Sequence, residues 1–239
     1  MQPKMREPSL QWRQDGDLYH VEVGSEQICI VSRSRITNYR FGVTARNISL
    51  ARQYGAVGVA PQMRGKSVID VGANVGEFSM FAADFEAKVY AIEPDPLAFS
   101  ALKKNMKGRG VKCHRLALWK ENATVPLTLI SETGDSTVLP VGADATIPVK
   151  AVTLKRFMDV LKLDDVFLLK ADCEGAEPEM LEGAGDALRR IAYITIDCGP
   201  ERYKQTTVGA CTKILTAHGF EVNQLNQKRV VLFCRRDDS

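Results

Sequence analysis

Two acidic stretches of the chain combine carboxylates with glycines at spacings that suit a nucleotide-like ligand. The first is VIDVGANVGEF, residues 68–78, where Asp70 lies inside an apolar run, Gly72 and Gly76 follow, and Glu77 comes next. Glycine permits a sharp strand-to-helix turn and lets the backbone approach a ligand closely. We expect this turn to hold a cofactor.

An acid at the end of the next apolar run supports this interpretation. Glu93 lies 21 positions after Gly72, close to the ~20 residues at which an acid reaches a ribose diol in nucleotide-binding βαβ units. The turn reads G-x-N-x-G and lacks the G-x-G-x-x-G pattern that cradles a diphosphate. Carboxylates at Asp70 and Glu77 would repel a pyrophosphate and attract an ammonium or sulfonium group. S-adenosylmethionine carries adenosine, a ribose diol and both cationic groups, so we predict this cofactor in preference to NAD.

The second stretch, FLLKADCEGAEPEMLEGA, covers residues 167–184. Asp172 would lie at the carboxyl end of a central strand, where open α/β sheets place ligands and chemistry. Glu174 follows closely, whereas Glu179 suits the first turn of a helix and needs no other reason. Asp197 ends the next apolar run. If the two strands are neighbours, Asp172 and Asp197 share one crevice, and they raise each other's pKa or attract a cation.

The helices and strands that must position these residues follow from the pattern of apolar and polar residues along the chain. From Lys66 onward, short apolar runs alternate with longer helical stretches, which is typical of a parallel sheet built from βαβ units. A strand, a polar turn and a second strand close the chain, unlike the pattern of dinucleotide-binding dehydrogenases. The predicted strands cover residues 67–71, 88–92, 111–117, 166–171, 192–197, 220–225 and 229–234. The predicted helices cover residues 76–85, 96–107, 153–161, 178–189 and 203–218.

Residues 1–60 carry no functional motif and are expected to form an extension. A β-hairpin is predicted over residues 18–32 and a short helix over residues 44–56. Residues 131–148 are rich in Gly, Ser, Thr, Asp and Pro and long for a connection. We expect this loop to order over the acceptor as a lid.

Composition limits the function classes. The 239 residues, 45% of them hydrophobic, suffice for one sizeable core. A formal net charge of +3 is too small to indicate dedicated nucleic-acid binding, and no NPPY-like motif is present. Six scattered cysteines without a CxxC pair are typical of a reducing compartment. No run approaches the ~18 apolar residues of a membrane span, and the polar start lacks a signal region, so we expect a cytoplasmic protein.

Five segments together resemble the FkbM-like family of S-adenosylmethionine-dependent methyltransferases: VIDVGANVGEFS, VYAIEPDPLAF, ALWKENATVPL, GDST and LLKADCEGAEPEMLEGA. The resemblance runs over residues 67–197, and residues 170–177 single out this family. It implies an α/β fold of the Rossmann-like class I methyltransferase type, with a seven-stranded, mostly parallel sheet and an antiparallel last strand, in a domain over residues 61–239. It also implies methyl transfer, chiefly to hydroxyl groups of sugars or natural products.

The resemblance assigns parts of the cofactor to residues of the turn and its neighbours. The turn would line the methionine and ribose, Glu93 would bind the ribose hydroxyls, and Pro94 would lie beside the adenine. Where relatives often have Glu, this chain has Asp197, which shortens a side chain facing the acceptor. The predicted cofactor-binding set is Asp70, Gly72, Ala73, Asn74, Gly76, Glu77, Glu93, Pro94, Ala117 and Asp172.

Two chemical schemes remain open for a small-molecule or glycosidic hydroxyl acceptor. In the favoured scheme no metal is needed, and Asp172, or in second place Glu174, takes the hydroxyl proton late, as the O–C bond forms. In the other, Asp172, Glu174 and Asp197 bind a magnesium-like divalent cation that acidifies the hydroxyl. A nucleic-acid methyltransferase and a non-catalytic cofactor-binding protein are the rival functions. The sequence does not indicate an oligomeric state.

Overall fold

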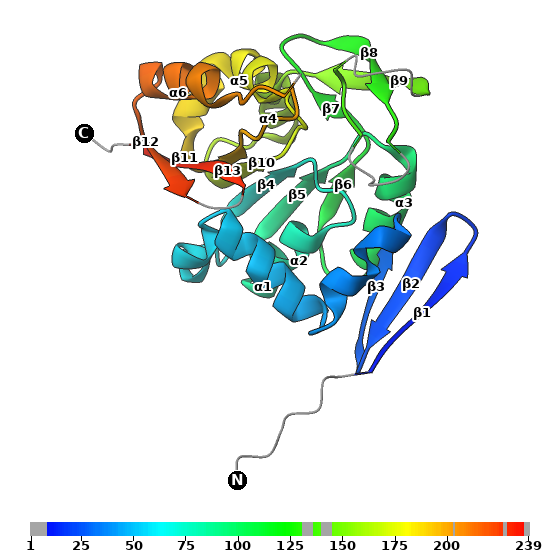
Figure 1. Ribbon diagram of the computed structural model, residues 1–239. Coiled ribbons are helices and arrows are strands. Elements are labelled where there is room, and N and C mark those ends of the chain that lie inside the picture. The colour runs from blue at the N-terminus through cyan, green and yellow to red at the C-terminus, as the bar shows by residue number, and fades with distance from the viewer. Residues whose placement is uncertain (1–8, 131–135, 140–144, 203, 227–228, 237–239) are drawn as a thin grey trace.

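The computed structural model describes residues 9–130, 136–139, 145–202, 204–226 and 229–236, and its centre is a seven-stranded sheet (Figure 1). The strand next to the carboxyl-terminal edge, β13, runs antiparallel to both of its neighbours, while the others run parallel. The predicted Rossmann-like class I methyltransferase fold, with its antiparallel last strand, is confirmed. In spatial order the strands are β12 (Phe220–Asn226), β13 (Val230–Arg236), β11 (Ile191–Asp197), β10 (Val166–Ala171), β4 (Ser67–Val71), β5 (Lys88–Ile92) and β6 (Lys112–His114).

Helices cover both faces of this sheet, which explains why its central strands are almost continuously apolar. On one face, helices α4, α5 and α6 pack against β4, β5, β10 and β11. On the other, α1, α2 and α3 pack against the same strands, with α1 and α2 below the sheet in Figure 1. The helices are α1 (Val43–Gln53), α2 (Glu77–Asp84), α3 (Pro96–Asn105), α4 (Leu154–Leu161), α5 (Glu177–Ala184) and α6 (Val208–Ala217).

The amino-terminal residues form a second, antiparallel sheet beside α3 (Figure 1). The hairpin expected over residues 18–32 is made by β2 (Leu18–Val23) and β3 (Glu26–Ile30), and β1 (Leu10–Asp15) adds a strand that the sequence pattern did not reveal. The side chain of Asn105 accepts a hydrogen bond from the backbone amide of Cys29 and donates to the carbonyls of Cys29 and Val75. Through this amide the small sheet is tied to the segment that follows β4.

Residues 33–63 connect this sheet to β4 and lie against the central sheet rather than apart from it. They comprise the 3-10 helix η1 (Arg33–Tyr39), helix α1, and the short turns η2 (Ala56–Gly58) and η3 (Ala60–Gln62). Leu50 and Tyr54 are buried in the same cluster as Phe78 and Leu168. The segment before β4 therefore packs against α2 and β10, close to the carboxyl ends of the central strands.

A third, small sheet lies beyond β6 and corrects one prediction. The single strand expected over residues 111–117 is wrong, because the chain leaves the main sheet after β6 and forms β7 (Ala117–Leu118) in the small one. The small sheet is completed by β8 (Ala123–Thr128) and β9 (Thr146–Val152). Prolines obscured these strands in the sequence. Pro126 and Pro148 face each other in register, beyond the end of β7, where β9 has a neighbour on one side only.

Three further predictions change in detail. The loop expected over residues 131–148 contains the start of β9, and residues 131–135 and 140–144 lie outside the described residues. The helix expected over residues 178–189 ends earlier, and the 3-10 helix η4 (Gly185–Arg190) follows it. Helix α6 begins five residues later than expected. Within the described ranges no helix combines the length and apolar character needed to cross a membrane.

Candidate functional site

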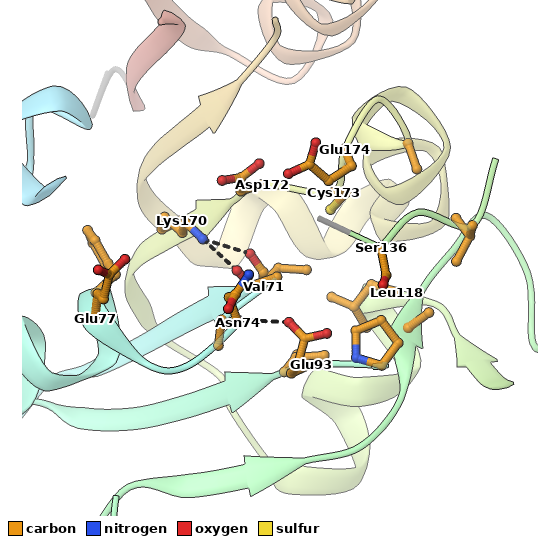
Figure 2. Close-up of a pocket in the computed structure, with 18 of the residues that line it drawn as sticks. Val71, Asn74, Glu77, Glu93, Leu118, Ser136, Lys170, Asp172, Cys173 and Glu174 are labelled. Carbon is orange, nitrogen blue, oxygen red and sulfur yellow. Dashed lines mark hydrogen bonds between the residues drawn. The ribbon is translucent and has the colours of Figure 1, made fainter. Parts of the chain in front are cut away.

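A pocket opens where the strand order of the main sheet reverses, between the carboxyl ends of β4 and β10 (Figure 2). Open α/β sheets bind their ligands at this kind of crevice. Gly72 follows β4 and Asp172 follows β10, and the two backbones nearly touch. A Cβ atom at Gly72 would lie 1.8 Å from the carbonyl oxygen of Asp172, and Gly72 has a φ of +64°. No other residue type fits this position.

Most of the predicted site residues line this pocket. Asp70 and Gly76 lie behind the turn instead. A Cβ atom at Gly76 would lie 2.6 Å from the side chain of Met106, so this glycine allows α2 to pack against α3. Asp197 is also absent from the pocket wall. The predicted residues in the wall are Gly72, Ala73, Asn74, Glu77, Glu93, Pro94, Ala117, Asp172 and Glu174.

A buried lysine shapes the turn after β4. Lys170 Nζ donates to the carbonyl oxygens of Val71 at 3.2 Å and Gly72 at 2.9 Å, and lies 3.1 Å from Asp70 Oδ1 (Figure 2). Ser79 donates to the other Asp70 oxygen at 2.6 Å. Burial would lower the pKa of Lys170, but the charges of Asp70 and Asp172 raise it above its ordinary value. The ammonium group is thus charged and satisfied, and it holds the turn in place.

The charge argument made from the sequence for this turn is wrong. Asp70 is neutralised by Lys170, and Glu77 is neutralised by Arg46, whose Nε and terminal nitrogen lie 2.8 and 3.2 Å from its two oxygens. Tyr39 also donates to Glu77 at 2.7 Å. The two carboxylates beside the turn are therefore compensated by basic residues that lie far away in the sequence. They offer no net negative charge to a cationic ligand.

Glu93 is held at the end of β5 by two backbone amides. Asn74 donates to Glu93 Oε2 at 2.7 Å (Figure 2), and Asp95 donates to Oε1 at 2.9 Å. The side chain is 6% exposed. Burial raises the pKa of Glu93 to about 7, against the lowering effect of the two amides. The two amides thus fix the direction of the carboxylate, which faces the pocket. A ligand that donates hydrogen bonds to it would favour its ionised form.

Part of the long loop closes the pocket beside Glu93. Ser136 lines the pocket and donates to Asp95 Oδ2 at 2.6 Å. The other oxygen of Asp95 accepts the amides of Leu97 and Ala98 and so caps the start of α3. Thr137 donates to the carbonyl oxygen of Glu174 at 3.0 Å. Residues 136–139 therefore bridge the ends of β5 and β10, while the lid function of the loop stays a prediction.

Asp172 lies at the centre of a network that the sequence did not reveal. Tyr54 donates to Asp172 Oδ2 at 2.7 Å, and Arg229 donates to the same oxygen at 2.8 Å. Burial would raise the pKa of Asp172, but the charges of Arg229 and Lys170 and the bond from Tyr54 outweigh it and lower the pKa. An ionised, weakly basic carboxylate results. It is poorly suited to deprotonate an alcohol before reaction.

Asp197 lies next to Asp172, as predicted from the neighbouring strands β10 and β11, but it does not line the pocket. It is 2% exposed, accepts the backbone amide of Gly199 at 3.0 Å, and pairs with Arg229 Nε. Burial and the charge of Asp172 raise its pKa. The cation attracted by these two carboxylates is the guanidinium of Arg229. Because that group occupies the space between them, Asp172, Glu174 and Asp197 do not fit a shared divalent cation.

Glu177 organises the turn after β10. It is 1% exposed and accepts the amides of Cys173 at 2.9 Å and Gly175 at 3.1 Å, and Thr207 donates to its second oxygen at 3.2 Å. Burial raises the pKa of Glu177 to about 8. Glu174 has a positive φ of 50° within this turn, a conformation that non-glycine residues rarely adopt. Glu177 thus imposes the backbone that presents Glu174 at the pocket.

Five residues that hold the predicted site carboxylates and the turn after β4 in place were not expected from the sequence. Lys170 had a detectable signal, because a lysine inside an apolar run is seldom buried without a partner. The others belong to no motif. Tyr39, Arg46 and Tyr54 come from the segment before β4, and Arg229 precedes β13.

The chain matches one family model and is similar to several known methyltransferases. The model of the family described as "Methyltransferase FkbM domain" matches residues 70–222. "Methyltransferase 1" of Beauveria bassiana is 31% identical over 156 residues, which are 54% of this chain and 62% of that protein, so the chain spans less than two thirds of this relative. "Hexuronic acid methyltransferase AglP" of Haloferax volcanii is 23% identical over 183 residues, covering 71% of this chain and 70% of that protein. The solved structure of magnesium protoporphyrin IX methyltransferase (ChlM) from Synechocystis PCC 6803 with bound SAM is 14% identical, with a TM-score of 0.49 over 86% of this chain and 85% of that chain.

Proposed function

Because the chain belongs to the FkbM methyltransferase family, we propose that it transfers a methyl group from S-adenosylmethionine to a hydroxyl group of a small-molecule or sugar acceptor. The observation that carries the cofactor assignment is the position of Glu93. Its carboxylate is held by two amides at the end of β5 and faces a pocket whose neighbouring wall is apolar. A ribose diol donates hydrogen bonds to such a carboxylate. The apolar residues beside it, which suit an adenine ring, are Pro94, Ala117, Leu118 and Leu127.

When bound, S-adenosylmethionine supplies a methyl group on a positively charged sulfur, which is already a strong electrophile. The main task of the protein is then to position the acceptor oxygen. Asp172 suits this task. Its Oδ2 is engaged by Tyr54 and Arg229, and its Oδ1 receives no hydrogen bond from the residues that the structure describes. We assign Oδ1 to accept the hydrogen bond of the acceptor hydroxyl.

The lowered pKa of Asp172 is compatible with late proton transfer. A free alcohol holds its proton too tightly for such a weak base. The oxygen would become strongly acidic once its bond to the methyl carbon forms and the sulfur–methyl bond breaks, with S-adenosylhomocysteine as the leaving group. Asp172 then accepts the proton without having generated an alkoxide. Glu174, at the same edge of the pocket (Figure 2), is the second carboxylate that we place near the acceptor.

One relative indicates the class of acceptor. The relative from Haloferax volcanii is named for a hexuronic acid, which favours a sugar acceptor for this chain as well. All six cysteines are free thiols, which is consistent with a reducing compartment. We propose a sugar or a glycosylated small molecule as the acceptor, and no nucleic acid.

Two experiments test the proposal in sequence. In calorimetry, S-adenosylmethionine and S-adenosylhomocysteine are expected to bind and NAD is not; equal affinity for NAD would overturn the cofactor assignment. The protein is then incubated with methyl-labelled S-adenosylmethionine and a panel of free sugars, glycosides, uronic acids and short RNA. An ether product keeps its label in dilute alkali, whereas a methyl ester releases labelled methanol. Label retained on a sugar supports the proposal, and label in RNA or in a base-labile ester contradicts it.

A further inference from the structure

The pocket has two chemically different ends. In Figure 2, Leu118 and Ser136 lie at one end, Glu77 lies at the other, and Asn74 and Lys170 lie between them. The Leu118 end is apolar apart from Glu93 and Ser136. The Glu77 end is bounded by the segment before β4 and carries guanidinium groups.

Two arginines from this segment line the Glu77 end. Arg46, on α1, is fixed by its two bonds to Glu77, and its side chain is 19% exposed. Arg35, on η1, lines the same pocket. Burial and Glu77 raise the pKa of Tyr39, and the charge of Arg35 opposes this rise; the same charge adds to the lowering of the Asp172 pKa by Arg229 and Lys170. Since Tyr39 itself bonds to Glu77, Arg35 lies within electrostatic reach of the Glu77 end and of the centre of the pocket. Both arginines precede residue 70, where the match to the family model begins.

The direction in which the cofactor must lie follows from the proposed function. With the ribose at Glu93, the adenine takes the apolar wall, so the amino-acid part runs over the turn at Gly72 toward the opposite end. That part ends in a carboxylate and an ammonium group. A carboxylate is costly to bury unless a cation and hydrogen-bond donors receive it. Arginine presents donors in a planar fork that matches a carboxylate.

We propose that Arg35 and Arg46 bind the carboxylate of the amino-acid part of the cofactor. The inference rests on the proposed function and adds to it a contact from outside the matched family segment. Arg46 uses Nε and one terminal nitrogen on Glu77, which leaves its remaining terminal nitrogen to donate. The Arg46–Glu77 pair thereby fixes the direction of one guanidinium. Arg35 supplies the second cation.

Two ligands separate this contact from the rest of the pocket. S-adenosylhomocysteine carries the adenosine, the thioether and the amino acid, whereas 5′-methylthioadenosine carries the first two and lacks the carboxylate and the ammonium group. Calorimetry with both ligands is carried out on the wild type and on Arg35→Gln, Arg35→Lys and Arg33→Gln. Arg33 is the matched control, because it lies on the same 3-10 helix but is placed over the ring of Trp12.

We expect Arg35→Gln to lower the affinity for S-adenosylhomocysteine roughly 10- to 100-fold, the loss typical of a charge-assisted hydrogen bond. The affinity for 5′-methylthioadenosine should change less than about twofold. Arg35→Lys should recover part of the loss, and Arg33→Gln should change neither ligand. Thermal melting without ligand checks that each variant is folded. Arg46→Gln is less informative alone, because it also leaves Glu77 without its cation.

The outcomes distinguish the inference from the proposed function. The carboxylate assignment is wrong if Arg35→Gln lowers the affinity for both ligands equally. It is also wrong if the affinity for S-adenosylhomocysteine does not change. An unaffected cofactor analogue combined with a raised KM for an acidic acceptor would place Arg35 on the acceptor side instead. If the wild type binds neither ligand, the proposed function itself fails.

Discussion

Tyr54 donates a hydrogen bond to Asp172 Oδ2 at 2.7 Å, although 118 positions separate the two residues in the chain. Tyr54 is fully buried, and its ring packs edge-to-face on Phe78 with centroids 6.0 Å apart. The segment before β4 therefore reaches the centre of the proposed site. The segment lines the pocket through Leu50 and belongs to the core through Tyr54.

Tyr54→Phe should remove this hydrogen bond and keep the ring. Because the bond favours the ionised carboxylate, its loss should raise the pKa of Asp172. We expect the acidic limb of the kcat/KM profile to shift to higher pH and turnover to fall, with little change in the affinity for S-adenosylhomocysteine. The stability loss should be about 0.5–1.5 kcal/mol. Tyr193→Phe, on β11, is the control, and an unshifted pH profile in Tyr54→Phe would separate Tyr54 from the chemistry.

Glu93→Ala should make the binding free energy of S-adenosylhomocysteine less favourable by about 1.5–3 kcal/mol, the usual loss for hydrogen bonds to a charged group. The pH dependence gives a sharper test. Burial raises the pKa of free Glu93 to about 7, and hydroxyl donors favour the ionised form. Affinity should therefore rise as pH increases through about 7 and then level off. Calorimetry at pH 6, 7 and 8 measures this trend, which Glu93→Gln should abolish; the same slope in that variant would assign the titration to another group.

Arg229→Met should leave Asp172 and Asp197 facing each other without their shared cation. Losing one partner of a fully buried pair costs about 3–5 kcal/mol. Since the Arg229 side chain is 34% exposed, we expect roughly 1–3 kcal/mol in urea denaturation. Adding Asp197→Asn should recover part of this loss by removing the repulsion. Arg235→Met, at an exposed position of β13, should have little effect. A double variant no more stable than Arg229→Met would show that the two carboxylates do not repel.

Glu177 should make the stability of the ligand-free protein fall with rising pH. Its pKa is raised by burial to about 8, so the folded chain keeps a proton that the unfolded chain loses near pH 4.5. The stabilisation is complete below the unfolded value and is lost as pH rises toward 8. Glu93 acts in the same direction. Thermal melts at pH 5.5 and 8.5 should show a smaller fall in Tm for Glu177→Gln than for the wild type. Glu182→Gln, exposed on α5, serves as the control. If Glu177→Gln shows the same fall in Tm as the wild type, Glu177 is not the source of the pH dependence.

Chelation should leave turnover unchanged. Arg229 occupies the space between Asp172 and Asp197 in which a shared ion would have to lie. We therefore expect the same rate with and without EDTA, and no gain from added magnesium or manganese. Activity that disappears in EDTA and returns with either ion would contradict both this expectation and the role given to Asp172 Oδ1.

The sequence alone determined the βαβ framework and the residues that lie close together within it. Gly72 and Glu93 belong to one β-strand–helix–β-strand unit, so their spacing already places them at neighbouring strand ends. Alternating apolar runs likewise predicted the main sheet and its final hairpin, because a parallel sheet must be covered on both faces. Strands β8 and β9 were not predicted, because they contain prolines, which are more typical of loops.

The charge state of the site, by contrast, depends on contacts between segments that are distant in the sequence. Asp70 and Glu77 appeared as free carboxylates in the sequence, but Lys170 and Arg46 neutralise them. Asp172 appeared as a candidate base, but Tyr54 and Arg229 make it a weak one. Spacing within one βαβ unit is set by local geometry, which a sequence pattern records. Partners from distant segments meet only when helices pack on the sheet, and burial then makes their interactions strong enough to set the pKa of each group.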